Sequence, residues 1–311
     1  MQTIFTHADT FHADELLAIA FLQMTILKDT PNRVIRTRDP ALLAPAVADS
    51  SVFVIDVGRA YAPDQLNFDH HQESFADTWP DGTPLSSCGL VWRWLRAQGA
   101  FNAWGSQALL DWLETELVRP ADEHDNGVKA WSPALFLGDY NRSSRSEEDA
   151  QAAFQQALRV THELIANARA RAQKDIESRD RMARALAEPI HAEGLVVIED
   201  GKASGFPYWA AKLGGPDIRL VVTPYKDQGW CLQATPSDLN DPFSASVQAP
   251  ETWRGCANLD VETANGPVPL IFCHKGGHLT LVRGSLSQAL DVAQHILVGS
   301  LITSERVAER D

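Results

Sequence analysis

The chain has 311 residues, of which 44% are hydrophobic and 22% charged, and its formal net charge is −14 at pH 7. These proportions are ordinary for a globular protein, and the length is sufficient for two domains with a sizeable core. No apolar run approaches the roughly 20 residues that cross a bilayer, and the first residues lack the pattern of a secretory signal, so we expect no membrane contact.

The cysteines indicate the cellular compartment to expect, and the distribution of charge indicates the kind of partner. Cys88, Cys231, Cys256 and Cys273 show no paired spacing, which favours a reduced protein in the cytoplasm. Residues 1–140 hold 9 Lys+Arg against 19 Asp+Glu, so the acidic excess is concentrated in the first half of the chain. Such a surface repels nucleic acid unless bound divalent cations reverse the charge locally.

Apolar segments in the first 140 residues predict strands that alternate with helices. The predicted elements are a strand at 3–6, a helix from near residue 10, strands at 34–37 and 51–57, and helices at 87–98 and 105–118. The segment 51–57 is β-branched and apolar, as expected of a strand buried on both faces. The alternation predicts an α/β domain with a mainly parallel sheet.

The rest of the chain predicts a long helix and then a smaller α+β domain. The stretch 146–188 contains neither Gly nor Pro, which is typical of one long helix or two. The predictions beyond it are strands at 194–199, 217–223, 229–235 and 268–273, a helix at 285–300, and loops at 201–216 and 236–267. We therefore expect a catalytic domain at 1–145, a helical connector at 146–190 and a second domain at 191–311.

Side chains of metal-ligand type recur where the predicted elements end. His7 follows the first strand, Asp56 ends the third, and His12 and Asp14 fall in the expected first turn of the first helix. Sites in open α/β sheets form beyond the carboxyl ends of the strands. The agreement between element ends and residue types indicates that the fold assembles these side chains into one site.

The number of these side chains suits two metal ions better than one. The candidates are His7, His12, Asp14, Asp56, Asp69, His70, His71, Asp122 and Asp125. Two-metal hydrolases need a bridging carboxylate and several further His and Asp ligands, and they use a water between the ions to attack phosphorus. Taken singly, each residue also fits a structural role, such as a loop histidine, a turn aspartate or an acid at a helix start.

The order and spacing of these motifs resemble the melanocyte-proliferating-gene exonuclease family, formerly an uncharacterised protein family, within the DHH phosphoesterase superfamily. The resemblance extends along nearly the whole chain. It rests on Thr6-His7, Thr10-Phe11-His12-Ala13-Asp14-Glu15, Arg36-Thr37-Arg38-Asp39, Val54-Ile55-Asp56-Val57-Gly58, Phe68-Asp69-His70-His71-Gln72, Asp122-x-x-Asp125-Asn126-Gly127, Trp253-Arg254-Gly255 and Gly276-Gly277-His278. It implies a DHH-type first domain and a DHH-associated, substrate-binding second domain.

The resemblance also implies roles for individual residues in the first domain. His7, His12 and Asp56 would hold one metal. The second metal would be held by Asp14, Asp56, His70 and one of Asp122 and Asp125, with Asp56 bridging the two ions. Asp122 is the preferred ligand of that pair, because Asp125-Asn126-Gly127 has the more obvious turn sequence.

Further roles concern catalysis and the substrate. His71 would face the phosphate, and Asp69 would orient an imidazole. In the second domain, Gly276, Gly277 and His278, with Lys275 and more weakly Arg254, would contact the substrate phosphate. The glycines would allow the backbone to approach it closely.

Two departures from the superfamily pattern bear on these roles. The first motif is usually Asp-x-Asp, whereas this chain has His12-x-Asp14, one residue further from His7. An imidazole in place of a carboxylate favours softer metals than magnesium. The last motif usually has a further glycine, and Lys275 occupies that place.

The expected function is metal-dependent phosphodiester hydrolysis with two divalent ions. Manganese is favoured, and magnesium, cobalt, zinc and iron are alternatives. The family implies 3′–5′ exonuclease activity on RNA, while short oligonucleotides or a small phosphorylated nucleotide also suit the sequence. Two other functions stay open: a non-catalytic metal- or nucleotide-binding protein, and metal-dependent hydrolysis of a non-phosphate bond. The oligomeric state also stays open, with a homodimer among the options.

Overall fold

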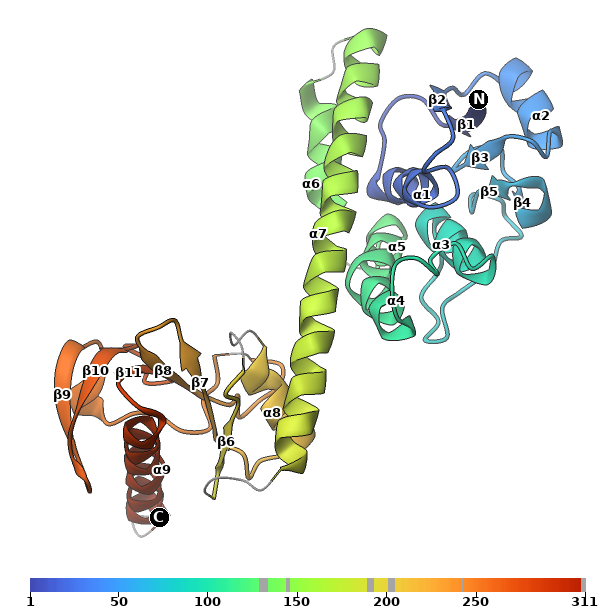
Figure 1. The fold of residues 1–311 in the computed structure, drawn as a ribbon. Helices are drawn as coiled ribbons and strands as arrows, with labels where there is room; N and C mark the ends of the chain where they lie inside the picture. Colours follow the sequence, from blue (N-terminus) through green and yellow to red (C-terminus); the bar gives the residue numbers. More distant parts are fainter. Residues whose placement is uncertain (129–133, 144–145, 189–192, 201–204, 242, 309–311) are drawn as a thin grey trace. The chain divides into compact units, whose positions relative to one another are not determined.

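The computed structural model divides the chain into two compact units, Met1–Gln173 and Lys174–Asp311 (Figure 1). The residues described are 1–128, 134–143, 146–188, 193–200, 205–241 and 243–308. The expected domain boundary at 190/191 falls outside the described part of the chain, and the one at 145/146 falls at the edge of a described segment.

The first unit contains a five-stranded sheet in the order β2-β1-β3-β5-β4. Its strands are β1 (Gln2–Thr6), β2 (Asn32–Arg36), β3 (Phe53–Ile55), β4 (Tyr61–Ala62) and β5 (Asn67–Phe68). The pairs β1–β2, β1–β3 and β3–β5 are parallel, and only β4 runs antiparallel to its neighbour. The expected mainly parallel α/β sheet is confirmed.

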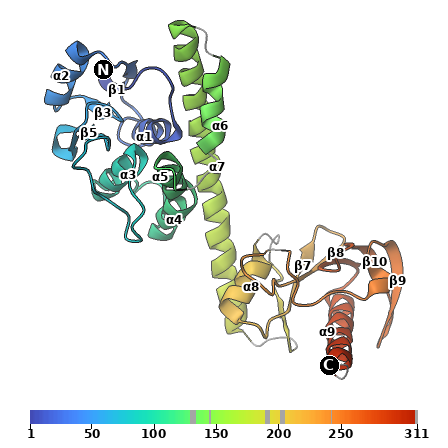
Figure 2. The ribbon, with the colours of Figure 1, turned by 180° about the vertical axis from the view of Figure 1, so that it is seen from behind.

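Helices of the first unit pack around a strongly apolar first helix. Ten of the twelve residues of α1 (Ala13–Met24) are buried, and α3 and α5 lie beside it (Figure 2). The other helical segments are α2 (Pro40–Ala48), η1 (Pro63–Gln65), α3 (Ser87–Ala97), α4 (Gln107–Leu113), η2 (Glu114–Val118), α5 (Arg119–Asp125), α6 (Ala134–Gly138) and η3 (Asp139–Ser143).

The helix expected at 105–118 continues further, because α4, η2 and α5 follow one another without a break. The middle segment η2 is one turn of π-helix, a feature that inserts an extra residue into the helical repeat and is frequent at functional sites. It sets the rotation of α5, on which Asp122 and Asp125 lie.

One helix, α7 (Glu147–Ala187), occupies the whole stretch expected to form one long helix or two. Its 41 residues begin with three acidic side chains, Glu147, Glu148 and Asp149, which are favourable near a helix N-terminus. The helix contributes residues to both compact units.

The second unit is an α+β fold with a six-stranded sheet in the order β6-β7-β8-β11-β10-β9. Only β6 and β7 are parallel, and the other pairs are antiparallel. The elements are β6 (Leu195–Val197), α8 (Phe206–Gly214), β7 (Leu220–Tyr225), β8 (Gly229–Ala234), η4 (Glu251–Trp253), β9 (Ala257–Thr263), β10 (Gly266–Cys273), β11 (Leu279–Arg283) and α9 (Leu286–Ala308).

The helix α9 covers one face of this sheet (Figure 1). Its buried residues Ala289, Val292, Ala293 and Ile296 recur at helical spacing and join one core cluster with the strands. The pattern of α9 was predictable, because apolar residues three and four apart form one face of a helix.

Three further expectations differ from the structure. The first helix begins at Ala13, so His12 caps it instead of lying in its first turn. The strand expected at 51–57 is shorter, because Asp56 has a positive φ of 57° that ends the extended backbone. The loops expected at 201–216 and 236–267 contain α8 and β9, whose Gly- and Pro-rich surroundings obscured the apolar pattern.

The part of the chain that the structure describes contains no helix with the length and apolarity needed to span a membrane.

Candidate metal centre

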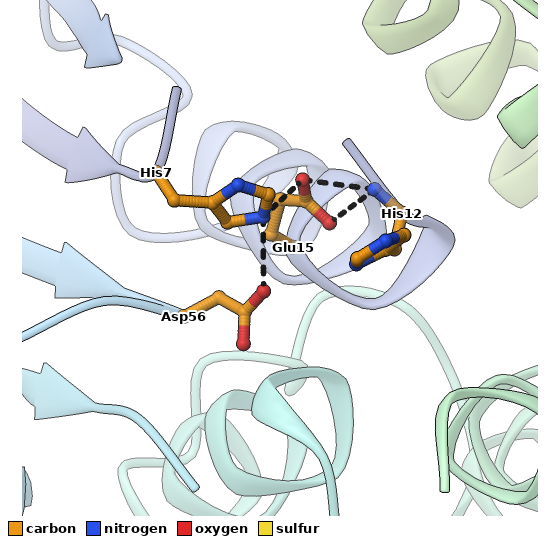
Figure 3. Close-up of side chains that lie close together, drawn as sticks. All are labelled: His7, His12, Glu15 and Asp56. Atoms are coloured by element: carbon orange, nitrogen blue, oxygen red, sulfur yellow. Dashed lines mark hydrogen bonds and ion pairs between the residues drawn. The ribbon is translucent and has the colours of Figure 1, made fainter. Parts of the chain in front are cut away.

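Two side chains meet at the carboxyl edge of the parallel sheet of the first unit. His7 directly follows β1, and Asp56 directly follows β3. These strands are neighbours in parallel register, so their carboxyl ends reach the same edge. His7 Nε2 lies 3.2 Å from Asp56 Oδ2, and both side chains are buried (Figure 3).

Asp56 lies between the two sides of the site. Its positive φ is uncommon for a residue other than glycine, and aspartate tolerates it better than most. While Oδ2 faces His7, Oδ1 accepts a hydrogen bond from Ser87 Oγ at 3.0 Å and lies 3.3 Å from His70 Nε2. One carboxylate oxygen thus faces each histidine, which is the arrangement a bridging carboxylate needs.

The ring of His7 presents one nitrogen to the carboxylates. Its Nδ1 lies 2.9 Å from the Ala8 carbonyl oxygen and 3.1 Å from Arg38 Nη2. When Nδ1 donates to Ala8, Nε2 keeps the lone pair with which histidine binds a metal. Burial alone would lower the pKa of His7, but hydrogen bonds to Asp56 and Glu15 raise it to about 10. The site therefore favours positive charge at this point, and a bound metal cation would supply it.

Glu15 is a member of the site that the sequence did not reveal. Its carboxylate is fully buried and lies 3.0 Å from His7 Nε2. The same carboxylate accepts hydrogen bonds from the backbone nitrogen of His12, at 2.8 and 2.9 Å (Figure 3). A glutamate three residues after a helix cap is a known signature, but histidine in place of serine or threonine at the cap obscured it.

The surroundings of Asp14 are those that would suit a bound cation. The residue is 1% exposed, and neither carboxylate oxygen has a hydrogen-bond partner among the described residues. Burial, together with repulsion from Asp56, Asp125 and Glu15, holds the pKa of Asp14 well above its usual range. A buried carboxylate without a partner is costly, and a metal ion relieves that cost.

The triplet after β5 divides into three different environments. His70 Nε2 lies 3.3 Å from oxygens of both Asp56 and Asp125. Asp69 accepts hydrogen bonds from His71 Nδ1 at 2.8 Å, from the His71 backbone nitrogen at 3.0 Å and from the Arg59 backbone nitrogen at 2.6 Å. His70 thus faces the cluster, whereas Asp69 fixes the orientation of His71.

His71 is oriented but accessible. Its side chain is 56% exposed, and it lines a cavity beside the cluster. The hydrogen bond to Asp69 raises the pKa of His71 above its ordinary value, although partial burial opposes the shift. An exposed ring with a raised pKa, next to buried candidate ligands, is suited to contact an anionic substrate.

The two aspartates of α5 have different surroundings. Asp122 is fully buried, and its oxygens accept hydrogen bonds from Ser86 Oγ at 2.6 Å, Trp79 Nε1 at 2.7 Å and the Gly89 nitrogen at 3.0 Å. Asp125 instead lies 3.3 Å from His70 and 4.0 Å from His12. The geometry thus favours Asp125 as the ligand, contrary to the sequence-based preference for Asp122.

Nitrogen and oxygen atoms of the cluster form three groups in which all atoms lie within 4.8 Å of one another. Asp56 and His12 each belong to two groups. The groups are His7, His12, Glu15 and Asp56; Asp56, His70 and His71; and His12, Asp14 and Asp125. Mixed imidazole and carboxylate sets of this kind fit divalent transition metals, and the unpartnered oxygens of Asp14 fit them as well.

The residues expected to contact substrate in the second unit gather at the turn between β10 and β11. Gly277 has a φ of 68°, and a Cβ there would lie 2.9 Å from Arg254 Nε, so only glycine fits. The ring of His278 lies 4.3 Å from that of His274, which the sequence did not single out. Burial and His274 together lower the pKa of His278.

Two contacts fix this turn. His274 Nδ1 accepts a hydrogen bond from the backbone nitrogen of Gly276 at 3.0 Å, and Arg254 Nε donates to the Ala249 carbonyl oxygen at 2.8 Å. Lys275 is exposed. The structure therefore brings Arg254 together with the glycine pair and adds His274 to the group.

Curated proteins are similar to this chain along most of its length. It is 30% identical to the MYG1 protein of Chlamydia pneumoniae, over 90% of this chain and 91% of that protein. It is 29% identical to the MYG1 exonuclease of Homo sapiens, over 91% of this chain and 84% of that protein.

Solved structures give a much weaker likeness. RecJ of Thermus thermophilus in complex with Mn²⁺ aligns with a TM-score of 0.28 and 12% identity, covering 95% of this chain and 51% of that one. Exonuclease RecJ bound to manganese aligns with a TM-score of 0.28 and 11% identity, covering 96% of this chain and 90% of that one. Scores this low support no argument about fold or function.

The family model MYG1_exonuc, described as Uncharacterised protein family (UPF0160), matches residues 3–297. This range includes every residue of the candidate centre and the turn between β10 and β11. The match confirms the family expected from the sequence motifs. The chain therefore belongs to the MYG1 exonuclease family.

Proposed function

We propose that this protein is a metal-dependent phosphodiesterase that acts as a 3′–5′ exonuclease on RNA or short oligonucleotides. The observation that carries the proposal is the convergence of three ligand groups on Asp56 and His12, with the unpartnered carboxylate of Asp14 among them. The exonuclease names of the mammalian relatives support the reaction class.

Two metal sites account for the ligand groups. His7, His12 and Asp56 would hold one ion, with Glu15 beside them. The second ion would be held by Asp14, Asp56, His70 and Asp125. Such a pair of ions, when bound, polarises the phosphate and activates a water for in-line attack.

Manganese is the metal we favour, because histidines and carboxylates occur together in both sets. We also place the protein in the cytoplasm. The described cysteines, Cys88, Cys231, Cys256 and Cys273, are all free, which agrees with a reducing compartment.

The other residues of the centre position the substrate. Asp69 holds His71 in one orientation, and the His71 ring can donate a hydrogen bond to a phosphate oxygen from its exposed side. Ser87 holds Asp56 through its hydroxyl group. In the second unit, Arg254, the glycine pair and His278 would bind a further part of the nucleic acid backbone.

The direct test is hydrolysis with controlled metal content. The purified chain, freed of metal and then supplied with manganese, magnesium or cobalt, is incubated with labelled oligoribonucleotides, oligodeoxyribonucleotides and mononucleotides. We expect mononucleotides to be released from the 3′ end of RNA only when metal is present. Absence of phosphoester cleavage on the whole panel would contradict the proposal and favour a non-catalytic binding role.

A matched pair of variants links the activity to the centre. Asp56→Ala removes the shared carboxylate, so both bound metal and activity should be lost. Asp64→Ala removes an exposed aspartate from the same unit and should leave both unchanged. Retention of full activity by Asp56→Ala would exclude its bridging role.

A further inference from the structure

A cavity of about 660 Å³ adjoins the candidate metal centre within the first unit. His7, His12, Asp56 and His71 contribute to one side of it. Small-molecule sites have volumes of roughly 300–1,000 Å³, so the space is large enough for one mononucleotide. A molecule that fills the cavity therefore contacts the centre and extends away from it.

Another part of the lining, called the α2 wall below, is an apolar stripe of that helix. The helix contributes Pro40, Leu43, Ala44 and Val47 to the lining, at the three- and four-residue spacing of one helical face. All four side chains are apolar. This wall can therefore pack against a flat base or a sugar, but it has no side chain to hydrogen-bond a base edge.

The wall is held in place by the core of the unit. Leu43 and Val47 pack against a buried cluster that includes Val54 and Val57. Gly58 has a φ of 94°, and a Cβ there would lie 2.7 Å from Val47 Cγ2, so glycine lets the loop after β3 pass close to α2. The cavity is thus a formed feature of the fold.

Two arginines provide positive charge at the same cavity. Arg38 lies 3.1 Å from His7 Nδ1 and 3.3 Å from Asp9, and Arg59 follows the loop that carries Asp56. Both side chains are exposed. In a chain with a net charge of −14, two guanidinium groups beside a metal centre fit a phosphate, which arginine binds well.

We propose that this cavity is the subsite for one nucleotide of the substrate. The base and sugar pack against the α2 stripe, and the phosphate lies between the two arginines and the metal centre. The proposal rests on the proposed function and extends it to the substrate unit next to the centre. Because the α2 wall offers no hydrogen bonds, the subsite accepts all four bases.

Binding measurements on the full chain test the subsite without turnover. Adenosine monophosphate and inorganic phosphate are titrated separately into the protein with manganese present, by calorimetry. We expect the nucleotide to bind at least about tenfold more tightly than phosphate, since only the nucleotide buries apolar surface on α2. Equal affinity, or no binding of either probe, would overturn the subsite.

Two substitutions on α2 isolate the apolar wall. Ala44 lines the cavity and is exposed, so Ala44→Glu places a charge in the subsite with little risk to folding. Ala48→Glu adds the same charge to the same helix at an exposed position outside the lining. Ala44→Glu should weaken nucleotide binding about tenfold and phosphate binding less than about threefold, and Ala48→Glu should change neither.

Two other results would contradict the proposed contacts of the subsite. If Ala44→Glu weakened nucleotide binding and phosphate binding equally, the new charge would be repelling the phosphate alone. That result would contradict contact between the α2 wall and the base or sugar. If one of the four nucleoside monophosphates bound more than about tenfold more tightly than the others, the claim that the subsite accepts all four bases would be wrong. The oligonucleotide assay separates the two proposals, because nucleotide binding without cleavage would overturn the exonuclease and leave the subsite intact.

Discussion

At the scale of single residues, the environment of each carboxylate indicates its role. Asp14 is buried without partners among the described residues, Asp56 is shared between two histidines, and Asp122 accepts its hydrogen bonds from within the protein. Residue type alone did not separate them. The three carboxylates are distinguished by the presence or absence of hydrogen-bond donors around each one.

The two aspartates of α5 give a direct comparison. Asp125→Asn removes a charge from the candidate centre, so we expect manganese affinity to fall at least about tenfold. Asp122→Asn changes a carboxylate outside the ligand groups, so affinity should stay within about threefold of wild type. Calorimetric titration of both metal-free variants measures this, and the reverse order would assign the ligand role to Asp122.

The stability of the metal-free protein should also depend on Asp122. Burial raises its pKa to about 7, although hydrogen bonds from Ser86 and Trp79 oppose the shift. The folded state thus binds this proton more tightly than the unfolded state, so stability falls as the pH rises from about 4 to about 7. The contribution reaches at most about 4 kcal/mol.

Chemical denaturation at several pH values measures this effect. Asp122→Asn has no proton to lose, so its free energy of unfolding should fall less over the same pH range than that of the wild type. The slope, and not the absolute stability, is the readout, because asparagine also disturbs the contact with Trp79. Identical slopes would show that Asp122 does not titrate in this range.

At the scale of elements, close helix packing supports the centre. The π-turn η2 joins α4 to α5, and α5 packs against α3 at Gly89. A Cβ on Gly89 would collide with Asp122 Oδ2. The absence of a side chain at this position lets α3 donate its backbone hydrogen bond to Asp122.

Gly89→Ala is therefore expected to destabilise the protein, although alanine is the better helix former by about 1 kcal/mol. We expect a net loss of about 2–3 kcal/mol from the overpacked contact. Thermal and chemical denaturation measure it. In an Asp122→Ala background the obstructing carboxylate is gone, so the same substitution should cost clearly less, and an equal cost in both backgrounds would refute the proposed contact.

At the scale of the whole molecule, the two compact units should respond differently to metal. All the candidate ligands lie in Met1–Gln173. Ligand binding stabilises the folded state by about 2.7 kcal/mol when the free metal is at 100 times its dissociation constant. Manganese should therefore stabilise the first unit and leave the second unit nearly unchanged.

Hydrogen exchange followed by mass spectrometry resolves the two units. We expect added manganese to slow exchange in α1, β3 and α5, and a chelator to reverse the effect. Peptides from β7 to β11 should exchange at the same rate in both states. Slower exchange confined to the second unit would place the metal elsewhere.

Much of the fold could be predicted from local patterns in the sequence. The apolar segments at β1 and β3, the long stretch without Gly or Pro at α7, and the helical periodicity of α9 each fixed an element and its type. Elements close to Gly and Pro were missed, α8 and β9 among them, because these residues indicate loops. Such elements form only when the sheet offers a face or an edge to pack on.

Some features of the candidate site could likewise be predicted from the sequence, and others could not. By itself, the sequence determined the family and the strand ends that carry His7 and Asp56, and it predicted the types of candidate ligand, because these depend on residue identity and local pattern. Only the tertiary structure placed Asp125, and not Asp122, beside His70 and His12, brought Glu15 to His7, and placed α2 beside the same cavity as the centre. These positions depend on helix rotation and on packing between segments far apart in the chain, and neither can be predicted from a local sequence pattern.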